Sequence, residues 1–375
     1  MAAVVQAARA PTPAPLSVVE HRGVRGFQAL RDEWNRALAE GPADLPFARH
    51  EWIDAWLAAF AAGREPLVLA ARDGAGRAHG FAIFLEDRQH GVCALTAPVN
   101  DHSCRYEWAL GAEPARAVEA LWGHLRDRST WDVLQLPELS REGPTFALLS
   151  GAARRDGHLL GVWDSVNTPY LSLDGGDPER RLSSKFVANL RRRLRRLCEQ
   201  GDVAVRRTDS RDGLEAALER FLLLEASGWK GKRGTAIALD PRLASFYTRI
   251  ARAAADGGWL AMRELTVGGK PIAMHLGLRY RGVYSLPKPA YDEAHAACSP
   301  GQLLFREVLA ESAAAGCSEV DFLGPDMPWK RDWEPRFRQH AWLYVYRPGL
   351  TGRALHAAKH RLRPFAKEVL RWWRR

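Results

Sequence analysis

The sequence predicts an α/β (α+β) protein built from two similar halves, each a mixed, mostly antiparallel sheet flanked by helices. The chain has 375 residues, which is too long for one ordinary hydrophobic core and suits two domains. The same order of strands and helices occurs twice, at an offset of roughly 190 residues. In each half, strands joined by short turns precede a helix and a further strand, an order that favours a mixed sheet over a doubly wound one.

The first half begins with the strand-forming run LSVVEH, and two stretches with the 3,4 spacing of apolar residues in amphipathic helices follow it. Three runs rich in β-forming residues come next, separated by glycine-containing turns such as DGAG. A helix and a last strand complete the pattern. The predicted helices are 27–38, 47–60 and 115–127, and the predicted strands are 16–21, 66–72, 79–87, 91–98 and 131–139.

The second half repeats this order, which indicates duplication rather than two unrelated α/β domains. Its predicted helices are 214–229, 243–255 and 301–315, and its predicted strands are 202–207, 259–267, 271–280, 282–287 and 319–324. The stretch SVNTPYLSLDGGDPER between the halves holds the Gly/Asp/Pro cluster of a boundary, which we place near residue 175. The prediction is a disordered tail at 1–15, domains at 16–175 and 176–348, and a basic tail at 349–375.

The composition argues against a membrane-spanning, disulfide-bonded or metal-binding protein. The apolar share of 46% and the charged share of 26% are typical of a soluble globular protein, and no apolar run approaches the roughly 18 residues of a membrane span. The five cysteines contain no CxxC pair, which predicts neither a disulfide framework nor a metal site and suits the reducing cytoplasm. The net charge is +10, but only eight of the 54 basic residues are lysine, an arginine skew that a GC-rich genome produces without function. We therefore expect no DNA partner.

Four stretches carry a family resemblance. They are FVANLRRRLRRLCEQG (186–201), GKPIAMHLGL (269–278), AYDEAHAACSPGQLL (290–304) and DFLGPDMPWKRDW (321–333). In this order and spacing, the second half resembles the CelD/FemAB-like branch of the GNAT acyltransferases, in which a basic helix, a Ser-Pro-Gly helix start and an aromatic-Lys segment follow one another. The resemblance extends over roughly residues 20 to 345 and implies tandem GNAT-like domains, with the second domain catalytic and the first degenerate.

The resemblance implies a donor site at the start of the helix after SPG. In a GNAT domain this loop holds the pyrophosphate of acetyl-CoA or another acyl-CoA, because free N–H groups at a helix start favour negative charge. The residues implied are Ser299, Pro300, Gly301, Gln302 and Leu303. The structural alternative is that Ser299 caps the helix with Pro300 at its first position. The usual glycine-rich cradle is absent, so a FemAB-like aminoacyl-tRNA donor stays open.

The lysine of WKRDW is the strongest catalytic candidate. Acyl transfer places negative charge on the carbonyl oxygen, and a fixed donor there lowers the barrier by about 3 kcal/mol. In the resembling family the lysine of the aromatic-Lys segment lies near the acyl carbonyl, and Lys330 matches it. Asp321 would orient Lys330 or accept a proton, or else cap backbone groups beside Gly324. Trp329 stands where relatives carry tyrosine and cannot act as a general acid.

Several polar residues are candidates for binding the acceptor. Asp101 and His102 follow a strand of the first half and would bind an acceptor hydroxyl or amine, or else form an Asx turn. His275 shares a strand face with Ala273 and Gly277, where small neighbours leave room for substrate, although a packed core histidine is the alternative. Tyr291 and Asp292 precede the donor loop and would line the acceptor pocket, or else form a plain turn.

Two basic stretches predict anionic partners. In FVANLRRRLRRL the apolar residues share one helical face, while Arg191, Arg192 and their neighbours crowd the others. Alone, this pattern favours a solvated face, and the family resemblance favours a phosphate-bearing partner. The C-terminal 353–375 is basic and ends in Trp372 and Trp373. This tail suits an anionic membrane surface as well as packing on the catalytic domain, and both readings stay open.

The expected function is transfer of an acyl group, most simply acetyl, from acyl-CoA to an amine or hydroxyl of a small-molecule or polysaccharide-precursor acceptor in cell-envelope or exopolysaccharide synthesis. No metal is expected. We expect the protein in the bacterial cytoplasm, with the inner face of the cytoplasmic membrane as a second place of action. The alternatives are an aminoacyl-tRNA-dependent transferase, the only reading with a tRNA partner, and an inactive membrane-associated binding module.

Overall fold

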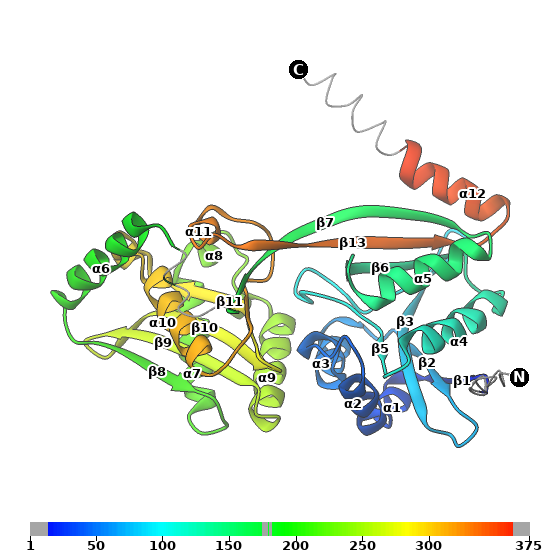
Figure 1. The fold of residues 1–375 in the computed structure, drawn as a ribbon, viewed down its shortest axis with the longest axis horizontal. Helices are drawn as coiled ribbons and strands as arrows, with labels where there is room; N and C mark the ends of the chain where they lie inside the picture. Colours follow the sequence, from blue (N-terminus) through cyan, green and yellow to red (C-terminus); the bar gives the residue numbers. More distant parts are fainter. Residues whose placement is uncertain (1–13, 175–178, 180–181, 363–375) are drawn as a thin grey trace, which may run out of the picture.

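The computed structural model describes residues 14–174, 179 and 182–362. Within these ranges the strands form one 13-stranded sheet in the order β1-β2-β3-β4-β6-β13-β7-β12-β11-β10-β9-β8, with β5 paired to β3 (Figure 1). The elements of the first half are β1 (Ser17–Arg22), α1 (Gly23–Gln28), α2 (Arg31–Glu40), η1 (Pro46–Ala48), α3 (His50–Phe60), β2 (Pro66–Arg72), β3 (Ala78–Gln89), β4 (Val92–Thr96), β5 (Ala109–Leu110), α4 (Pro114–Asp127), β6 (Val133–Ser140), α5 (Pro144–Arg155) and β7 (Leu159–Ser172).

The second half follows the same order. Its elements are α6 (Ser184–Cys198), β8 (Val203–Thr208), α7 (Leu214–Ser227), α8 (Trp229–Lys232), η3 (Ile237–Leu239), α9 (Pro241–Asp256), β9 (Leu260–Val267), β10 (Lys270–Tyr280), β11 (Val283–Tyr291), η4 (Glu293–Cys298), α10 (Pro300–Ala314), β12 (Glu319–Asp321), α11 (Pro328–Arg331), β13 (Arg336–Tyr346), α12 (Leu350–Ala357) and η5 (Ala358–Leu362).

The predicted sheet class is confirmed. Strands β1 to β4 and strands β8 to β11 pair antiparallel in sequence order, and each set ends in one parallel pair, β4 with β6 and β11 with β12. The crossover in each half is a helix, α4 or α10, because parallel neighbours need a connection long enough to return to the same edge. The helix predicted at 27–38 is divided into α1 and α2, with Ala29 and Leu30 between them.

Two strands that the sequence did not predict join the halves. Strand β13 pairs antiparallel with both β6 and β7, and β7 pairs antiparallel with β12. The last strand of each half therefore lies beside strands of the other half, and β7 and β13 run together across both lobes in Figure 1. The boundary near residue 175 stays a prediction, but the hydrogen-bonded sheet is continuous across it. Most residues of β7 are half-buried and lack a clean alternation, which explains why the sequence pattern was weak.

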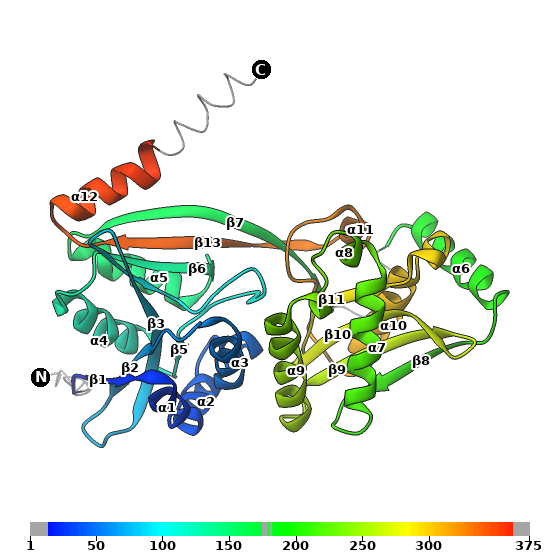
Figure 2. The same cartoon turned by 180° about the vertical axis from the view of Figure 1, so that it is seen from behind.

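The halves also meet through helices. Helix α3 packs against α9, where the Trp52 ring lies 5.4 Å edge-on to the ring of Phe246 and the Phe60 ring is equally close. The view from behind in Figure 2 shows the same two helices facing each other. One buried hydrophobic cluster includes the core of the first half and the α7 and α9 face of the second sheet region, while a second cluster lies under α6 and α10. The junction between the halves is therefore a continuous packed core.

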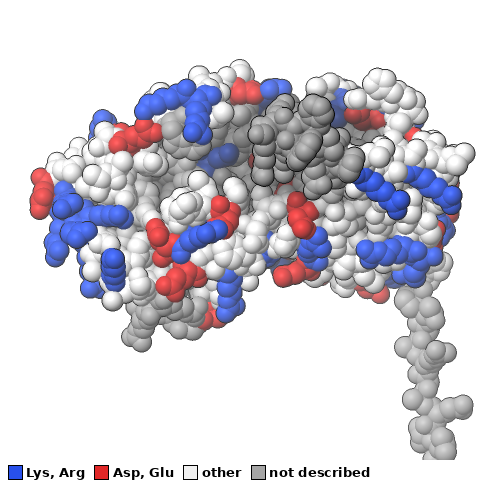
Figure 3. Space-filling view, turned by 90° about the horizontal axis from the view of Figure 1, so that it is seen from above, with Lys and Arg blue, Asp and Glu red and all other residues white. Residues whose placement is uncertain are grey.

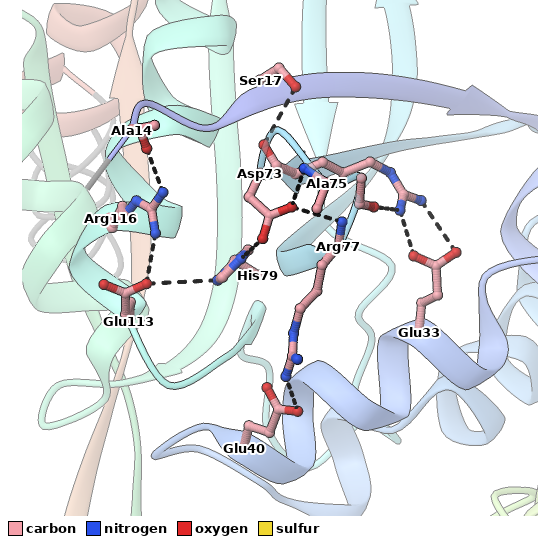
Figure 4. A network of polar contacts seen from close by, with 12 residues as sticks. Ala14, Ser17, Glu33, Glu40, Asp73, Ala75, Arg77, His79, Glu113 and Arg116 are labelled. Carbon is pink, nitrogen blue, oxygen red and sulfur yellow. Dashed lines mark hydrogen bonds and ion pairs between the residues drawn. The ribbon is translucent and has the colours of Figure 1, made fainter.

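A polar network fixes the turn between β2 and β3 at the far edge of the first half (Figure 4). Asp73 Oδ1 accepts the N–H groups of Ala75 and Arg77, both at 3.0 Å, and Asp73 Oδ2 lies 2.9 Å from His79 Nε2. Arg77 Nη2 donates to Glu40 at 2.6 Å. The network therefore ties this turn to α2.

The described part of the basic tail packs on the sheet. His356 donates to the Leu160 carbonyl at 3.2 Å, and His360 Nε2 lies 2.9 Å from the Tyr346 hydroxyl. A Cβ at Gly161 would lie 1.9 Å from His360 Nε2, so this close packing requires glycine there. Residues 350–362 therefore pack on β7 of the first half and β13 of the second, rather than on the catalytic domain alone. The remainder of the tail, with Trp372 and Trp373, and most of the N-terminal tail at 1–15 lie outside the described residues.

Candidate active site

Helix α6 presents the arginines that the sequence singled out. Its start is capped by the Ser183 hydroxyl, which accepts the Phe186 N–H at 3.3 Å. The predicted apolar face is buried in the second core through Phe186, Leu190, Leu194 and Leu197. Arg191 and Arg192 are exposed, and no ion pair joins the arginines of α6 to a carboxylate within the ranges that the structure describes. Basic side chains gather at this end of the molecule (Figure 3, left). Helix α6 therefore offers unneutralised positive charge.

The start of α10 differs from the predicted cap. Ser299 has left-handed backbone angles, φ 47° and ψ 58°, and its hydroxyl caps no backbone group. Its carbonyl accepts the N–H groups of Gln302 at 3.0 Å and Leu303 at 3.1 Å. A Cβ at Gly301 would meet no atom within 4 Å, so the surface over Gly301 is open. The first turn keeps an open face, but two of its N–H groups are already bonded.

This geometry corrects part of the predicted donor set. The side chains of Pro300 and Leu303 are buried in the core, and proline has no N–H to offer. Gln302 Nε2 donates to Asp332 at 3.0 Å. Ser299 and Gly301 are the members of the predicted set that stay placed to contact a donor at the helix start.

Aromatic packing brings three of the sequence motifs together. The Phe305 ring on α10 lies 6.2 Å from the Trp329 ring and 4.8 Å from the Trp333 ring. The Trp333 ring in turn lies 5.1 Å edge-on to Phe186 of α6. Together with the bond from Gln302 to Asp332, these contacts fix the WKRDW segment over the first turns of α10 and beside the basic helix.

Lys330 is buried. Its side chain is 4% exposed, and Nζ donates to the carbonyls of Leu323 at 2.5 Å and Pro325 at 2.8 Å. Burial lowers the pKa of Lys330 to about 8, against an opposing contribution from Asp321. An ammonium has three N–H groups, so one remains beyond the two carbonyl bonds. The side chain therefore holds the 321–330 loop and keeps one donor for a further acceptor.

Asp321 links the two halves through hydrogen bonds. Its carboxylate is 0% exposed, and Oδ1 accepts the Leu323 N–H at 2.9 Å. Oδ2 accepts from Arg105 of the first half and from Arg338 of β13 at 3.3 Å. Both oxygens are engaged, which corrects the reading of Asp321 as a proton acceptor. Asp321 is a positioning residue that holds the Leu323 turn from one side while Lys330 holds it from the other.

The first-half loop reaches the second half through His102. Asn100 Oδ1 accepts the His102 N–H at 3.0 Å and the Ser103 hydroxyl at 3.3 Å, so the predicted Asx turn is present. His102 Nδ1 lies 2.9 Å from the Tyr247 hydroxyl on α9, while Asp101 is exposed. Burial, and then the nearby Lys288 ammonium, lower the pKa of His102 to about 4, so this ring is neutral at pH 7.

The other predicted acceptor residues do not join this group. His275 is 1% exposed and lies 6.4 Å from the Phe305 ring, which corrects its substrate-binding assignment to that of a packed core histidine. Asp292 accepts the Ala294 N–H at 2.9 Å as the cap of η4. Tyr291 ends β11 on the surface.

The sequence patterns did not single out Arg105, Arg338 or Lys288. The rarity of lysine in this chain was the signal that could have pointed to Lys288.

Buried histidines predict acid sensitivity. Burial lowers the pKa of His275 to about 3 from 6.5, so between these values the unfolded state binds more protons and stability falls as the pH falls. This single group contributes a slope of about 1.4 kcal/mol per pH unit below pH 6.5. His275→Leu should show a shallower loss of unfolding free energy between pH 7 and pH 5 in urea titrations. The exposed His90→Asn variant should follow the wild type, and equal slopes for all three proteins would contradict the assignment.

Two cavities of the described structure lie away from the candidate site. These surface cavities, of about 410 and 440 Å³, lie under α12 and beside α1, and neither is lined by Lys330 or the start of α10. Among the described residues, no group of three or more His, Cys, Asp or Glu side chains is arranged to hold a metal ion. None of the helices in the same ranges is both long and apolar enough to span a membrane.

Comparison with known proteins agrees with this geometry. Residues 184–331 match the family model of the acetyltransferase (GNAT) domain, a range that includes α6, α10 and Lys330. No curated protein matches by sequence. Among solved structures, FemX is similar with a TM-score of 0.62 and 13% identity over 88% of this chain and 98% of its own.

Two further structures share the fold. The C-terminal DUF2156 domain of an Agrobacterium fabrum protein, provisionally assigned as a lysylphosphatidylglycerol synthetase, has a TM-score of 0.54 and 12% identity over 87% of this chain and 95% of its own. A Bacteroides thetaiotaomicron protein of unknown function has a TM-score of 0.53 and 11% identity over 85% and 97%. At these identities the likeness concerns the fold alone. Residues 184–331 are therefore similar to the acetyltransferase (GNAT) domain, and the solved structures share the fold of most of the chain.

Proposed function

We propose that the protein transfers an acyl group from acyl-CoA, with acetyl-CoA as the simplest donor, to an amine of a cell-envelope or exopolysaccharide precursor. A hydroxyl acceptor is the less favoured variant. The observation that carries the proposal is the convergence of the basic helix α6, the open start of α10 and the Lys330 segment around Phe305. The acceptor class rests on the CelD/FemAB resemblance.

The donor would lie with its charged end between α6 and the start of α10. Arg191 and Arg192 lie on the exposed face of α6 and form no ion pair among the described residues, although Arg192 donates to Asn189 at 2.8 Å. They suit phosphate groups, which accept the paired N–H groups of a guanidinium. The open surface over Gly301 leaves room for a phosphate to approach the backbone. From there the thioester would extend towards Lys330, which the WKRDW segment holds over the same helix.

The chemistry is a direct transfer. The amine lone pair attacks the thioester carbonyl, a C–N bond forms, and the C–S bond breaks with its electron pair left on sulfur. The amine releases one proton and the thiolate takes up one, so the reaction is proton-neutral. The third N–H of Lys330 stabilises the carbonyl oxygen as it becomes negative, while Asp321 and the two bonded carbonyls hold the loop in place.

Arg191→Gln combined with Arg192→Gln should weaken binding of CoA about tenfold or more, because two charge-assisted contacts to phosphate are removed. Isothermal titration of the full chain with CoA at low and high salt measures this, and the wild-type affinity should fall more steeply with salt. The matched control is Arg249→Gln with Arg353→Gln, which removes the same charge from exposed arginines of α9 and α12.

Equal CoA affinity in both double variants would exclude α6 from the donor site. Native mass spectrometry of the purified protein provides the first test, because retained CoA or acyl-CoA would identify the donor directly. Binding of aminoacyl-tRNA without binding of CoA would replace this proposal by the tRNA-dependent reading. If the protein bound the donor without transferring its acyl group, and Lys330→Ala bound the donor equally well, the inactive binding module would be favoured.

A further inference from the structure

Lys288 is a lysine that the mechanism above does not use. It lies on β11, where one extra residue interrupts the pairing with β10: Leu276 is opposite Lys288, but Leu278 is opposite Ser285. A β-bulge of this kind re-aims the side chains beyond it. Leu286 before the bulge belongs to the core under α10, whereas Ala290 after it belongs to the core under α7 and α9. The bulge therefore turns Lys288 towards α9 and the first half.

Among the residues that the structure describes, the ammonium of Lys288 has no carboxylate partner. Nζ lies 5.4 Å from the centre of the Tyr247 ring, whose hydroxyl meets His102 of the first half. Helix α7, which contacts β11, carries Glu225, but the two oxygens of Glu225 accept from Lys230 at 3.0 Å and from the Ile237 N–H at 2.7 Å. Within the described ranges no ion pair to Lys288 is formed. Burial, and then Lys230, lower the pKa of Lys288.

The strand edge around Lys288 has few other donors. The parallel pairing of β11 with β12 ends at Ser285 and Asp321, so β11 continues without that neighbour. Pro287 and Pro289 flank Lys288 and have no backbone N–H. The first-half loop that places His102 against Tyr247 also carries Arg105, which donates to Asp321, and Asp321 and Lys330 both bond the backbone of Leu323. An anion bound by Lys288 would therefore lie at the junction of the halves and near the proposed transfer centre.

We propose that Lys288, with the Tyr247 hydroxyl and His102 beside it, binds an anionic group of the acceptor, a carboxylate or a phosphate. The inference deepens the proposed function and rests on it: the acceptor is an acid-bearing amine, held by its acid across the junction while its amine meets the thioester near Lys330. A half-buried ammonium that forms no ion pair among the described residues is costly, and a bound anion offsets that cost. Neutral His102 supplies a hydrogen bond without competing for the anion.

Three amino sugars test this inference without any donor: glucosamine, glucosamine 6-phosphate and muramic acid, which carry an amine with no acid, with a phosphate and with a carboxylate. Isothermal titration of the wild type should show one of the two acids binding at least tenfold more tightly than glucosamine, and the better acid identifies the group. Lys288→Gln should lose this preference. Lys270→Gln, which removes an exposed lysine of the adjacent strand, should retain it.

An equal preference in Lys288→Gln, or no preference for either acid in the wild type, would overturn the inference. Urea unfolding of Lys288→Met separates binding from structure, since removal of an unpaired ammonium should leave the stability unchanged or increase it. A large loss of stability would show that Lys288 is structural. The amino-sugar titrations contain no acyl donor. If the protein failed to bind CoA, the proposed donor would be refuted, but these titrations would still test the role of Lys288.

Discussion

Arg105→Met should lower the free energy of unfolding by about 3–5 kcal/mol, because it leaves the buried Asp321 carboxylate without its main partner. Arg105 comes from the first half and is itself buried, and the two side chains join positions 216 residues apart. Arg338 remains at 3.3 Å from the same oxygen, but it also serves Glu319 at 2.9 Å. The remaining guanidinium is therefore shared, and compensation is incomplete.

Unfolding in guanidinium chloride measures the loss of stability in Arg105→Met, and two further variants serve as comparisons. Arg155→Met removes an arginine from an exposed pair with Glu119, in which both side chains are 61% exposed, and should cost less than about 1 kcal/mol. The double variant Arg105→Met with Asp321→Asn removes both charges and should recover part of the loss. A cost for Arg105→Met no larger than that of Arg155→Met would show that the pair between the halves is not important for stability.

Lys330→Met should reduce the rate of acyl transfer by about 10²- to 10³-fold at saturating donor, the usual effect of removing one donor to the developing oxyanion. Donor affinity should change little, because the phosphate contacts of α6 remain. Single-turnover assays with acetyl-CoA measure the rate. The control is Arg331→Gln, which removes the adjacent, 69% exposed cation that pairs with Asp326. Equal rates in both variants would remove Lys330 from the mechanism.

The pH dependence of stability gives Lys330 a second readout that does not require substrate. Its folded pKa of about 8 lies below the ordinary value of 10.5, so between these values the unfolded state binds more protons. The stability contributed by this group therefore rises as the pH increases from 8 to 10.5 and is absent below pH 8. Lys330→Met should remove that rise. A rise that persists would place the titration on another group.

Much of the candidate site follows from local sequence patterns. The apolar positions Phe186, Leu190, Leu194 and Leu197 repeat at helical spacing, and the structure buries that face and exposes the arginines. The helix start at Ser299 and the strand ending at Asp321 also lie where the sequence places them. These features depend on neighbours within a few residues, so a single sequence is sufficient to predict them.

The site predictions that the structure corrects depend on contacts between residues distant in the sequence. His275 has an alternating strand pattern that is compatible with a substrate face, but only the packing of α10 shows that Phe305 covers it. Pro300 and Leu303 stand in the helix-start motif, yet they point into the core. Lys288 faces the first half because of a bulge, and a bulge of one residue leaves no strong mark on the sequence.

By itself, the sequence determined the repeated order of elements, the mixed sheet, the amphipathic basic helix and the position of a lysine after the DFLG strand. Only the tertiary structure decided that β13 crosses to pair with β6, that Arg105 neutralises Asp321, that Lys330 is buried, and that half-buried Lys288 lies beside Tyr247, which meets His102 of the other half. The physical reason is the range of the interactions. Periodicity and helix caps act over a few residues, whereas strand exchange and burial of charge depend on which distant surfaces exclude water together.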